Sequence, residues 1–135
     1  MSVAFLQEES IRWSDVDAMG VVNNAVYLTL FEQARYGYFR ALACLTGDWF
    51  PFVLGATAVR FLRPGRAGMR VVVGARVTRL GHKSFDMSYS VTCGEDELAT
   101  GTATLVWVAA DLTSAPIPDD VRATIAAREG IPSRG

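Results

Sequence analysis

Two carboxylates stand in a short polar segment directly ahead of a long apolar helix pattern. Asp15 and Asp17 are followed by Gly20 and then by the amide pair Asn23 and Asn24. The start of a helix offers unpaired backbone N–H groups and a partial positive charge, which can stabilise an oxygen that gains negative charge during a reaction. An acid beside such a helix start can act as nucleophile or general base. This spacing therefore predicts a catalytic pair of carboxylate and helix terminus.

The remaining residues argue against several other kinds of active site. His82 is the only histidine, it follows Gly81 in a predicted hairpin turn, and no G-x-S-x-G sequence occurs. A triad hydrolase is therefore not expected. With one histidine and two distant cysteines, Cys44 and Cys93, we expect neither a metal site nor a disulfide framework.

Basic residues gather in the middle of the chain. The interval from Trp49 to Phe85 has no Asp or Glu but holds Arg60, Arg63, Arg66, Arg70, Arg76, Arg79 and Lys83. Such segregation can attract a phosphate-bearing or acidic partner, or the arginines can simply solvate the outer faces of strands. Aromatic residues are scarce among them and no nucleic-acid motif appears, so nucleic-acid binding is not expected.

Hydrophobic periodicity, together with capping and turn-forming residues, predicts the helices and strands that must position these residues. We predict a strand over 3–13, a loop over 14–22, a helix over 25–45 with Asn23 or Asn24 as its N-cap, strands over 52–63, 69–80, 83–93 and 97–108, and a short helix from Pro118 to about Arg128. The connections RPGRAG, GHK and CGED are short and turn-forming, which predicts that the four strands they join are antiparallel neighbours. Small residues at Ala99, Gly101 and Ala103 would let a helix approach the sheet closely.

Length and composition predict one domain over 1–130 and a disordered tail over 131–135. Half of the residues are hydrophobic, yet no apolar run is long enough to span a bilayer and no leader is recognisable. We expect a soluble, cytoplasmic protein that does not bind membranes. One sheet face covers only part of so apolar a helix, so a homodimer sharing a continuous sheet, or a homotetramer, would supply further cover.

The run DVDAMGVVNNAVYLTLFEQAR, from Asp15 to Arg35, and this order of elements resemble the 4-hydroxybenzoyl-CoA thioesterase family, which includes acyl-CoA thioesterases. The resemblance covers nearly the whole domain. It implies the α+β hotdog fold, a curved five-stranded antiparallel sheet wrapped around one long central α-helix, plus a short C-terminal helix. It also implies hydrolysis of an acyl-CoA thioester to free acid and coenzyme A. No cofactor is implied, because coenzyme A enters as part of the substrate.

The same resemblance implies roles for individual residues. The second acid of its D-x-D-x-x-G motif, Asp17, would be the catalytic carboxylate, and the helix start at Asn24 would polarise the carbonyl. The alternative for Asp17 is a loop acid that caps the following turn, whereas Asp15 is expected to support the loop. The positions assigned to substrate binding are Asp15, Gly20, Val22, Asn23, Tyr27, Arg60, Lys83 and Ser84, the last two contributed by either subunit of a dimer.

Two departures from the family pattern leave alternatives open. Many relatives carry a histidine where this chain has Val21, and others carry one where it has Asn24. Either Asp17 alone suffices or activity is weak. Separately, Glu32 is an alternative catalytic acid, as in one hotdog branch, although a pair with Arg35 one turn away is the expected arrangement. A thioesterase for acyl carrier protein and a non-catalytic acyl-thioester-binding module remain rival functions. The pattern does not choose between nucleophile and general base for Asp17.

Overall fold

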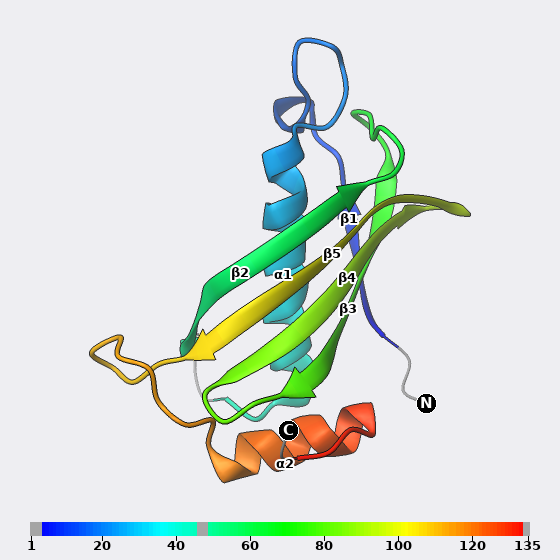
Figure 1. The fold of residues 1–135 in the computed structure, drawn as a ribbon. Coiled ribbons are helices and arrows are strands. Elements are labelled where there is room, and N and C mark those ends of the chain that lie inside the picture. The colour runs from blue at the N-terminus through cyan, green and yellow to red at the C-terminus, as the bar shows by residue number, and fades with distance from the viewer. Residues whose placement is uncertain (1–3, 46–48, 134–135) are drawn as a thin grey trace.

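The computed structural model of the chain describes residues 4–45 and 49–133. It contains five strands, two α-helices and one turn of 3₁₀ helix (Figure 1). Their bounds are β1 Phe5–Ser10, η1 Trp13–Asp15, α1 Asn24–Leu42, β2 Phe52–Phe61, β3 Arg70–Leu80, β4 Ser84–Cys93, β5 Asp96–Trp107 and α2 Asp119–Glu129. The predicted first strand is too long, because the chain turns into η1 directly after Ile11 and Arg12; Val3 lies outside the described residues.

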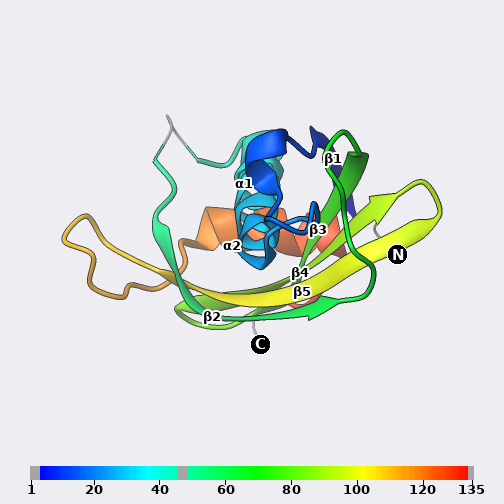
Figure 2. The same ribbon diagram turned by 90° about the horizontal axis from the view of Figure 1, so that it is seen from above.

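The five strands form one antiparallel sheet in the order β1-β3-β4-β5-β2. The sheet is curved, with α1 on its inner side (Figure 2), which agrees with the predicted hotdog fold. The prediction that RPGRAG joins neighbouring strands is wrong. β2 pairs with β5 at one edge and β3 pairs with β1 near the other, so this segment crosses from one side of the sheet to the other. The carbonyl of Gly65 accepts from the loop ahead of α1, whereas the N–H groups of Arg63 and Gly68 donate to Leu98 and Ile11. Sequence spacing alone does not reveal these contacts.

Alternation along β4 decides which side chains face α1. Phe85, Met87 and Tyr89 are buried, whereas Ser88 and Ser90 on the opposite face are only half-buried. The outer face of the sheet is thus lined by small polar residues, and the inner face carries the core.

The helix α1 begins one residue earlier and ends three residues earlier than predicted. Asn23 is its N-cap, and its side-chain Oδ1 accepts a hydrogen bond of 3.0 Å from the N–H of Ala25. The helix ends because Ala43 adopts a left-handed conformation with φ of 54°, and its N–H donates to the carbonyl of Arg40. None of the helices within the described ranges is long and apolar enough to cross a membrane.

The C-terminal helix α2 closes one end of the molecule, next to the β3–β4 turn (Figure 1). The Arg122 guanidinium donates to the carbonyls of Gly81, His82 and Ser133 at 2.7, 3.1 and 2.7 Å. Of the tail predicted over 131–135, the first three residues are described, and residues 134 and 135 lie outside the described part. The domain limits stay a prediction.

Several members of the basic interval meet acids on adjacent strands. Because antiparallel pairing brings distant segments together, the charge segregation seen along the chain is partly offset in three dimensions. The ion pairs are Arg63–Asp96 at 3.8 Å, Arg70–Glu8 at 3.7 Å and Arg79–Asp86 at 2.8 Å.

Candidate active site

The segment ahead of α1 is a tight hairpin-like loop. The N–H of Asp17 donates to the carbonyl of Val21 at 2.8 Å, and the N–H of Gly20 donates to the carbonyl of Asp17 at 3.0 Å. Gly20 has a φ of +77°, a left-handed conformation that a glycine adopts without steric cost. This pairing places Asp17 opposite Val21. Val21 lies three residues before Asn24, the first residue of the helix.

The side chain of Asp17 holds this loop through one of its two oxygens. Its Oδ1 accepts hydrogen bonds from the N–H groups of Met19 and Val21, at 2.8 and 3.4 Å. Its Oδ2 accepts no hydrogen bond from any residue in the described part of the chain, and the side chain is exposed. The turn-capping alternative is therefore present in the structure, and it leaves half of the carboxylate available.

The start of α1 presents a backbone donor that its own N-cap does not satisfy. The side chain of Asn23 satisfies the N–H of Ala25, and the carbonyl of Asn23 accepts from Val26 at 2.9 Å. Within residues 4–45 and 49–133, the backbone N–H of Asn24 donates to no acceptor. This N–H lies at the positive end of the helix dipole, where an oxygen that gains negative charge would be stabilised.

Asp15 has the supporting role that was predicted for it. It is 6% exposed, and its carboxylate accepts from the N–H of Arg12 at 2.8 Å and from the Arg12 guanidinium at 3.0 and 3.3 Å. These hydrogen bonds lower the pKa of Asp15 below its ordinary value. The carbonyl of Asp15 accepts from the N–H of Asn23 at 2.8 Å, which ties it to the helix cap.

The crossover from β2 to β3 packs against the same loop. The N–H of Val22 donates to the carbonyl of Gly65 at 2.8 Å, and Val21 and Arg66 form an isolated antiparallel bridge. Tyr27 is 3% exposed, and burial raises its pKa. Val22 and Tyr27 thus position the helix start from the core. Arg66 was not among the predicted site residues, because only the crossover reveals that it lies beside this loop.

Three predicted substrate-binding residues lie elsewhere in the same chain. Arg60 and its partner Thr100 lie on the outer face of the sheet, away from α1. Lys83 and Ser84 lie at the β3–β4 turn beside α2, at the opposite end from the start of α1 (Figure 1). A single chain therefore does not bring these residues to the helix start.

The predicted ion pair between Glu32 and Arg35 is wrong. Glu32 is exposed, and Arg35 is buried and donates from Nη1 to the hydroxyl of Tyr89 at 2.7 Å instead. The guanidinium points into the sheet, whereas the carboxylate stays at the surface. Sequence reasoning noted Arg35 on an apolar helix but had no means of finding Tyr89, 54 residues away.

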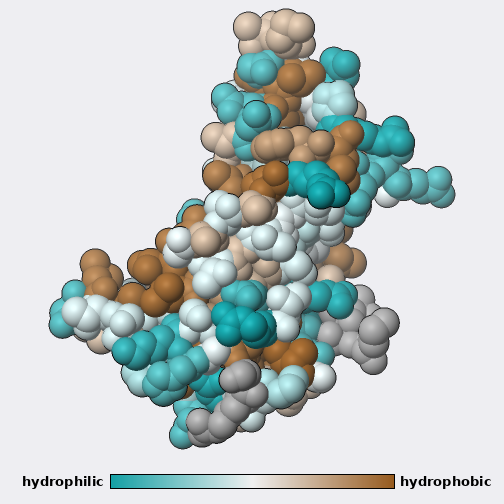
Figure 3. All heavy atoms as spheres, in the orientation of Figure 1, coloured by the Kyte–Doolittle hydropathy of each residue, from teal (hydrophilic) through white to brown (hydrophobic). Residues whose placement is uncertain are grey.

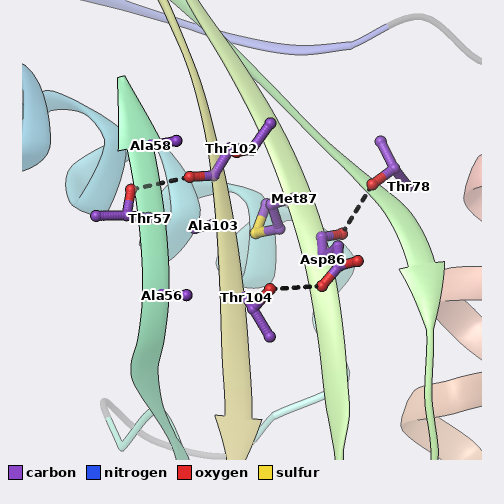
Figure 4. A pocket seen from close by; sticks show the side chains of 9 residues that line it. All are labelled: Ala56, Thr57, Ala58, Thr78, Asp86, Met87, Thr102, Ala103 and Thr104. Carbon is purple, nitrogen blue, oxygen red and sulfur yellow. Dashed lines mark hydrogen bonds between the residues drawn. The ribbon is translucent and has the colours of Figure 1, made fainter. Parts of the chain in front are cut away.

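A separate cavity of about 400 Å³ lies on the outer face of the sheet (Figure 4). Its only carboxylate, Asp86, is held by the Arg79 guanidinium and accepts from the hydroxyl of Thr104 at 2.8 Å. Arg79 also lowers the pKa of Asp86. Figure 3, which looks onto this face, shows mostly residues of intermediate hydropathy across the middle of the sheet. With its one acid fully engaged, this cavity offers no free general base.

The part of the chain that the structure describes thus brings one half-free carboxylate and one unpaired N–H to the same end of α1. This combination can polarise a carbonyl and deliver either a carboxylate oxygen or an activated water to its carbon. Among residues 4–45 and 49–133, no cluster of three or more His, Cys, Asp or Glu side chains could hold a metal ion.

Comparison with known proteins connects this arrangement to one family. Residues 11–125 match the model of the Thioesterase-like superfamily. A thioesterase from Thermus thermophilus, solved with coenzyme A and Zn, is 36% identical, with a TM-score of 0.86 over 97% of this chain and 98% of that chain. A 1,4-dihydroxy-2-naphthoyl-CoA hydrolase from Nostoc punctiforme is 26% identical over 88% of this chain and 84% of its own length. A 1,4-dihydroxy-2-naphthoyl-CoA thioesterase from Synechocystis shares the fold, with a TM-score of 0.82 at 21% identity over 93% of this chain and 98% of that chain.

Proposed function

The chain belongs to the thioesterase-like superfamily, and from this premise we propose that it hydrolyses acyl-CoA thioesters to the free acid and coenzyme A. The observation that carries the proposal is the likeness, over 97% of this chain, to a thioesterase that was solved with coenzyme A. The Nostoc relative, named as a hydrolase of an aromatic acyl-CoA, supports the same donor. The half-free carboxylate of Asp17 and the free N–H of Asn24 supply the chemistry that this reaction needs.

The reaction would proceed with the thioester carbonyl oxygen accepting a hydrogen bond from the N–H of Asn24. As a nucleophile, the Asp17 carboxylate attacks the carbonyl carbon, and the C–S bond breaks to give a mixed anhydride and the thiolate of coenzyme A. Water then splits the anhydride, which restores Asp17 and releases the acid. As a general base, Asp17 instead takes a proton from the water that attacks directly. Neither route needs a cofactor.

The working unit in this proposal is a homodimer formed through β2. In the described chain, β2 pairs with β5 on one side only, and Arg60 is its only charged residue. Val53 and Leu54 on this edge are 44% and 48% exposed, and Leu28 on α1 is 39% exposed. An apolar edge strand with a single charge favours pairing with another strand. A second copy would extend the sheet and cover the exposed side of α1.

A dimer would also let polar and basic side chains that lie far from the helix start contact the substrate. Lys83 and Ser84 lie far from the helix start of their own chain, so we propose that they contact the phosphates of a coenzyme A bound at the other subunit's site. Arg66 beside the catalytic loop is a third candidate, with Arg60 a fourth on the outer face. Phosphate contacts of this kind would weaken as ionic strength rises.

Substitution of Asp17 by asparagine tests the function directly. Free-thiol release from a panel of acyl-CoAs should fall by roughly 10²–10⁴-fold in kcat, because the nucleophile or base is removed while the amide oxygen still caps the turn. Asp111→Asn is the matched control. Asp111 is also exposed, and it accepts from the N–H and hydroxyl of Thr113 at 3.1 and 2.7 Å.

The control should retain full activity. Equally slow thiol release by wild type and the Asp17 variant would favour the non-catalytic binding module. Release from acyl carrier protein thioesters, but not from acyl-CoA, would favour the carrier-protein enzyme. That reaction should show the stronger salt sensitivity because a protein surface is recognised.

A further inference from the structure

Arg35 is a buried cation with no anionic partner in the part of the chain that the structure describes. It is 6% exposed on the inner side of α1, and no acid among the described residues lies within ion-pair distance of it. Its Nη1 donates to the Tyr89 hydroxyl at 2.7 Å, and its Nε is buried with no hydrogen-bond partner among the described residues. A guanidinium carries five N–H donors, and an unpaired charge in a protein interior is strongly unfavourable. A group that completes this site is therefore expected to be an anion.

Tyr89 does not supply that anion. Its hydroxyl accepts from Arg35 and donates to the sulfur of Met87 at 3.4 Å. Burial raises the pKa of Tyr89, so the phenol stays neutral. Tyr89 instead holds the guanidinium in place, with the Arg35 Cζ 5.9 Å from the centre of its ring.

An open cavity of about 130 Å³ lies beside the guanidinium, between α1 and β2. Its lining is mainly apolar, with Thr29, Thr57 and the exposed Glu32 among its polar members; the other residues are Leu28, Phe31, Arg35, Leu54, Tyr89 and Ala103. Since one water takes up ~30 Å³ of liquid, the cavity holds roughly four groups of that size. It has room for a carboxylate and one or two methylene groups.

The cavity lies on the helix face that leads from the proposed reaction site. Asn24, Leu28 and Arg35 are separated by four and seven residues, which places them on one stripe of α1. The stripe runs roughly 16 Å from Asn24 to Arg35 at ~1.5 Å per residue. Leu28 between them is apolar, so a ligand that follows this stripe meets a polarising N–H first, a hydrophobic side chain next and a buried cation last.

We propose that Arg35 binds a carboxylate at the far end of the acyl group, so that the preferred substrates are coenzyme A monothioesters of dicarboxylic acids. The assignment rests on the proposed thioesterase function and names its substrate class. The two terminal nitrogens of the planar guanidinium match a carboxylate in bidentate geometry. Among the described residues, only Nη1 has a partner, and it uses one of its two N–H groups. The methylene chain crosses Leu28, and the second carboxyl group enters the cavity.

The test compares matched pairs of acyl-CoAs. Dicarboxylic monothioesters of six, eight and ten carbons are each assayed beside the straight-chain acyl-CoA of equal length, and the ratio of kcat/KM is recorded. The ratio for the best dicarboxylic chain length should fall by at least about tenfold in Arg35→Met, the loss expected for a hydrogen-bonded charge pair. Arg35→Lys keeps the charge without the fork and should recover part of the ratio.

Arg40→Met is the control on the same helix, because Arg40 is exposed and its guanidinium lies over Phe50, 5.3 Å from the ring centre, outside the cavity. It should leave the ratio unchanged. Circular dichroism and thermal unfolding establish that each variant is folded. If Arg35→Met does not fold, the ratio in Arg35→Lys and the wild-type affinity for suberate over octanoate carry the test.

The carboxylate site and the thioesterase activity give different results if either is absent. Hydrolysis with the same ratio in wild type, Arg35→Met and Arg35→Lys overturns the carboxylate site and leaves the thioesterase intact. Loss of the dimer in Arg35→Met with an unchanged ratio also overturns it, because the missing anion then belongs to a second copy. If no thioester is hydrolysed, calorimetric titration with suberate and octanoate decides: Arg35-dependent binding of suberate alone supports the site, and equal binding overturns it.

Discussion

Two aspartates, two positions apart, have different surroundings. The Asp15 side chain is buried, and both of its carboxylate oxygens accept from Arg12 through three hydrogen bonds. Asp17 is exposed, and only its Oδ1 is used by the loop. A carboxylate that reacts needs a free oxygen, which Asp17 has and Asp15 lacks. The structure thus separates a buried acid with its oxygens paired from an exposed acid with one free oxygen, where the residue type alone does not.

Asp15 should make the stability of the protein depend on pH. Its folded-state pKa is lowered, so its stabilising contribution is present above the unfolded value of about 3.9 and is lost as pH falls through the folded value. We expect Asp15→Asn to cost about 1–2 kcal/mol at pH 7 and clearly less at pH 3. Urea unfolding at both pH values measures the difference. Glu95→Gln, at the exposed β4–β5 turn, is the charge-matched control, and a cost for Asp15→Asn that is equal at both pH values would contradict the prediction.

At the scale of elements, the closeness of α1 to the sheet depends on a glycine in β5. A Cβ at Gly101 would lie 2.9 Å from Cζ of Phe31 and still closer to its Cε2. Phe31 in turn stacks on Tyr89, with ring centres 4.7 Å apart. The predicted close approach of the helix over the small residues of β5 is confirmed. The same contact keeps the wall of the Arg35 cavity in place.

Gly101→Ala should therefore destabilise the protein by about 1–3 kcal/mol, because the stacked ring cannot move without disturbing its neighbours. Gly74→Ala on β3 is the control. There the new Cβ would lie 2.9 Å from the Ser90 hydroxyl oxygen, the mobile end of a short side chain on the outer face. Thermal unfolding of both variants should show a large loss for Gly101 and a small one for Gly74. Equal losses of stability would mean that the contact with Phe31 does not make Gly101 more sensitive to an added Cβ than Gly74.

For the whole molecule, the proposed dimer would add a second chain to the surroundings of the candidate site. The exposed side chain of Leu28 on α1 and the free edge of β2 lie side by side, since Leu28 and Leu54 line the same cavity. Lys83 and Ser84 lie at the opposite end of the molecule from Asn24. A second copy joined at β2 would cover Leu28 and place its own basic side chains near the site. We therefore expect activity to depend on assembly.

Val53→Lys tests this assembly, because a lysine on an edge strand blocks pairing with another strand. We expect the dimer to dissociate at least about tenfold more readily in light scattering after size exclusion, with a parallel loss of thioesterase activity. Leu6→Lys is the matched control, because Leu6 is 60% exposed on β1, the edge strand at the other side of the sheet. A β2 variant that dimerises as tightly as the β1 variant would refute pairing through β2.

The sequence by itself determined the local features. Period-two alternation marked β4, a capping amide marked the start of α1, and a D-x-D-x-x-G motif marked the loop and the family. These features depend on residues that are close in the chain, where spacing sets the geometry directly. The role of Asp15 as a loop support was predicted for the same reason, whereas the close helix approach over β5 was predicted from the small size of its residues.

Only the tertiary structure decided which distant segments meet. RPGRAG has the residues of a hairpin turn, yet it crosses the sheet, and its backbone bonds to the loop at Val22, to Ile11 and to Leu98. Glu32 and Arg35 have the spacing of an ion pair, yet the guanidinium turns to Tyr89 on β4. In both cases a long-range contact outweighs a local preference. The reason is that hydrogen-bond partners and burial depend on which distant segments pack together, and not only on neighbours in the chain.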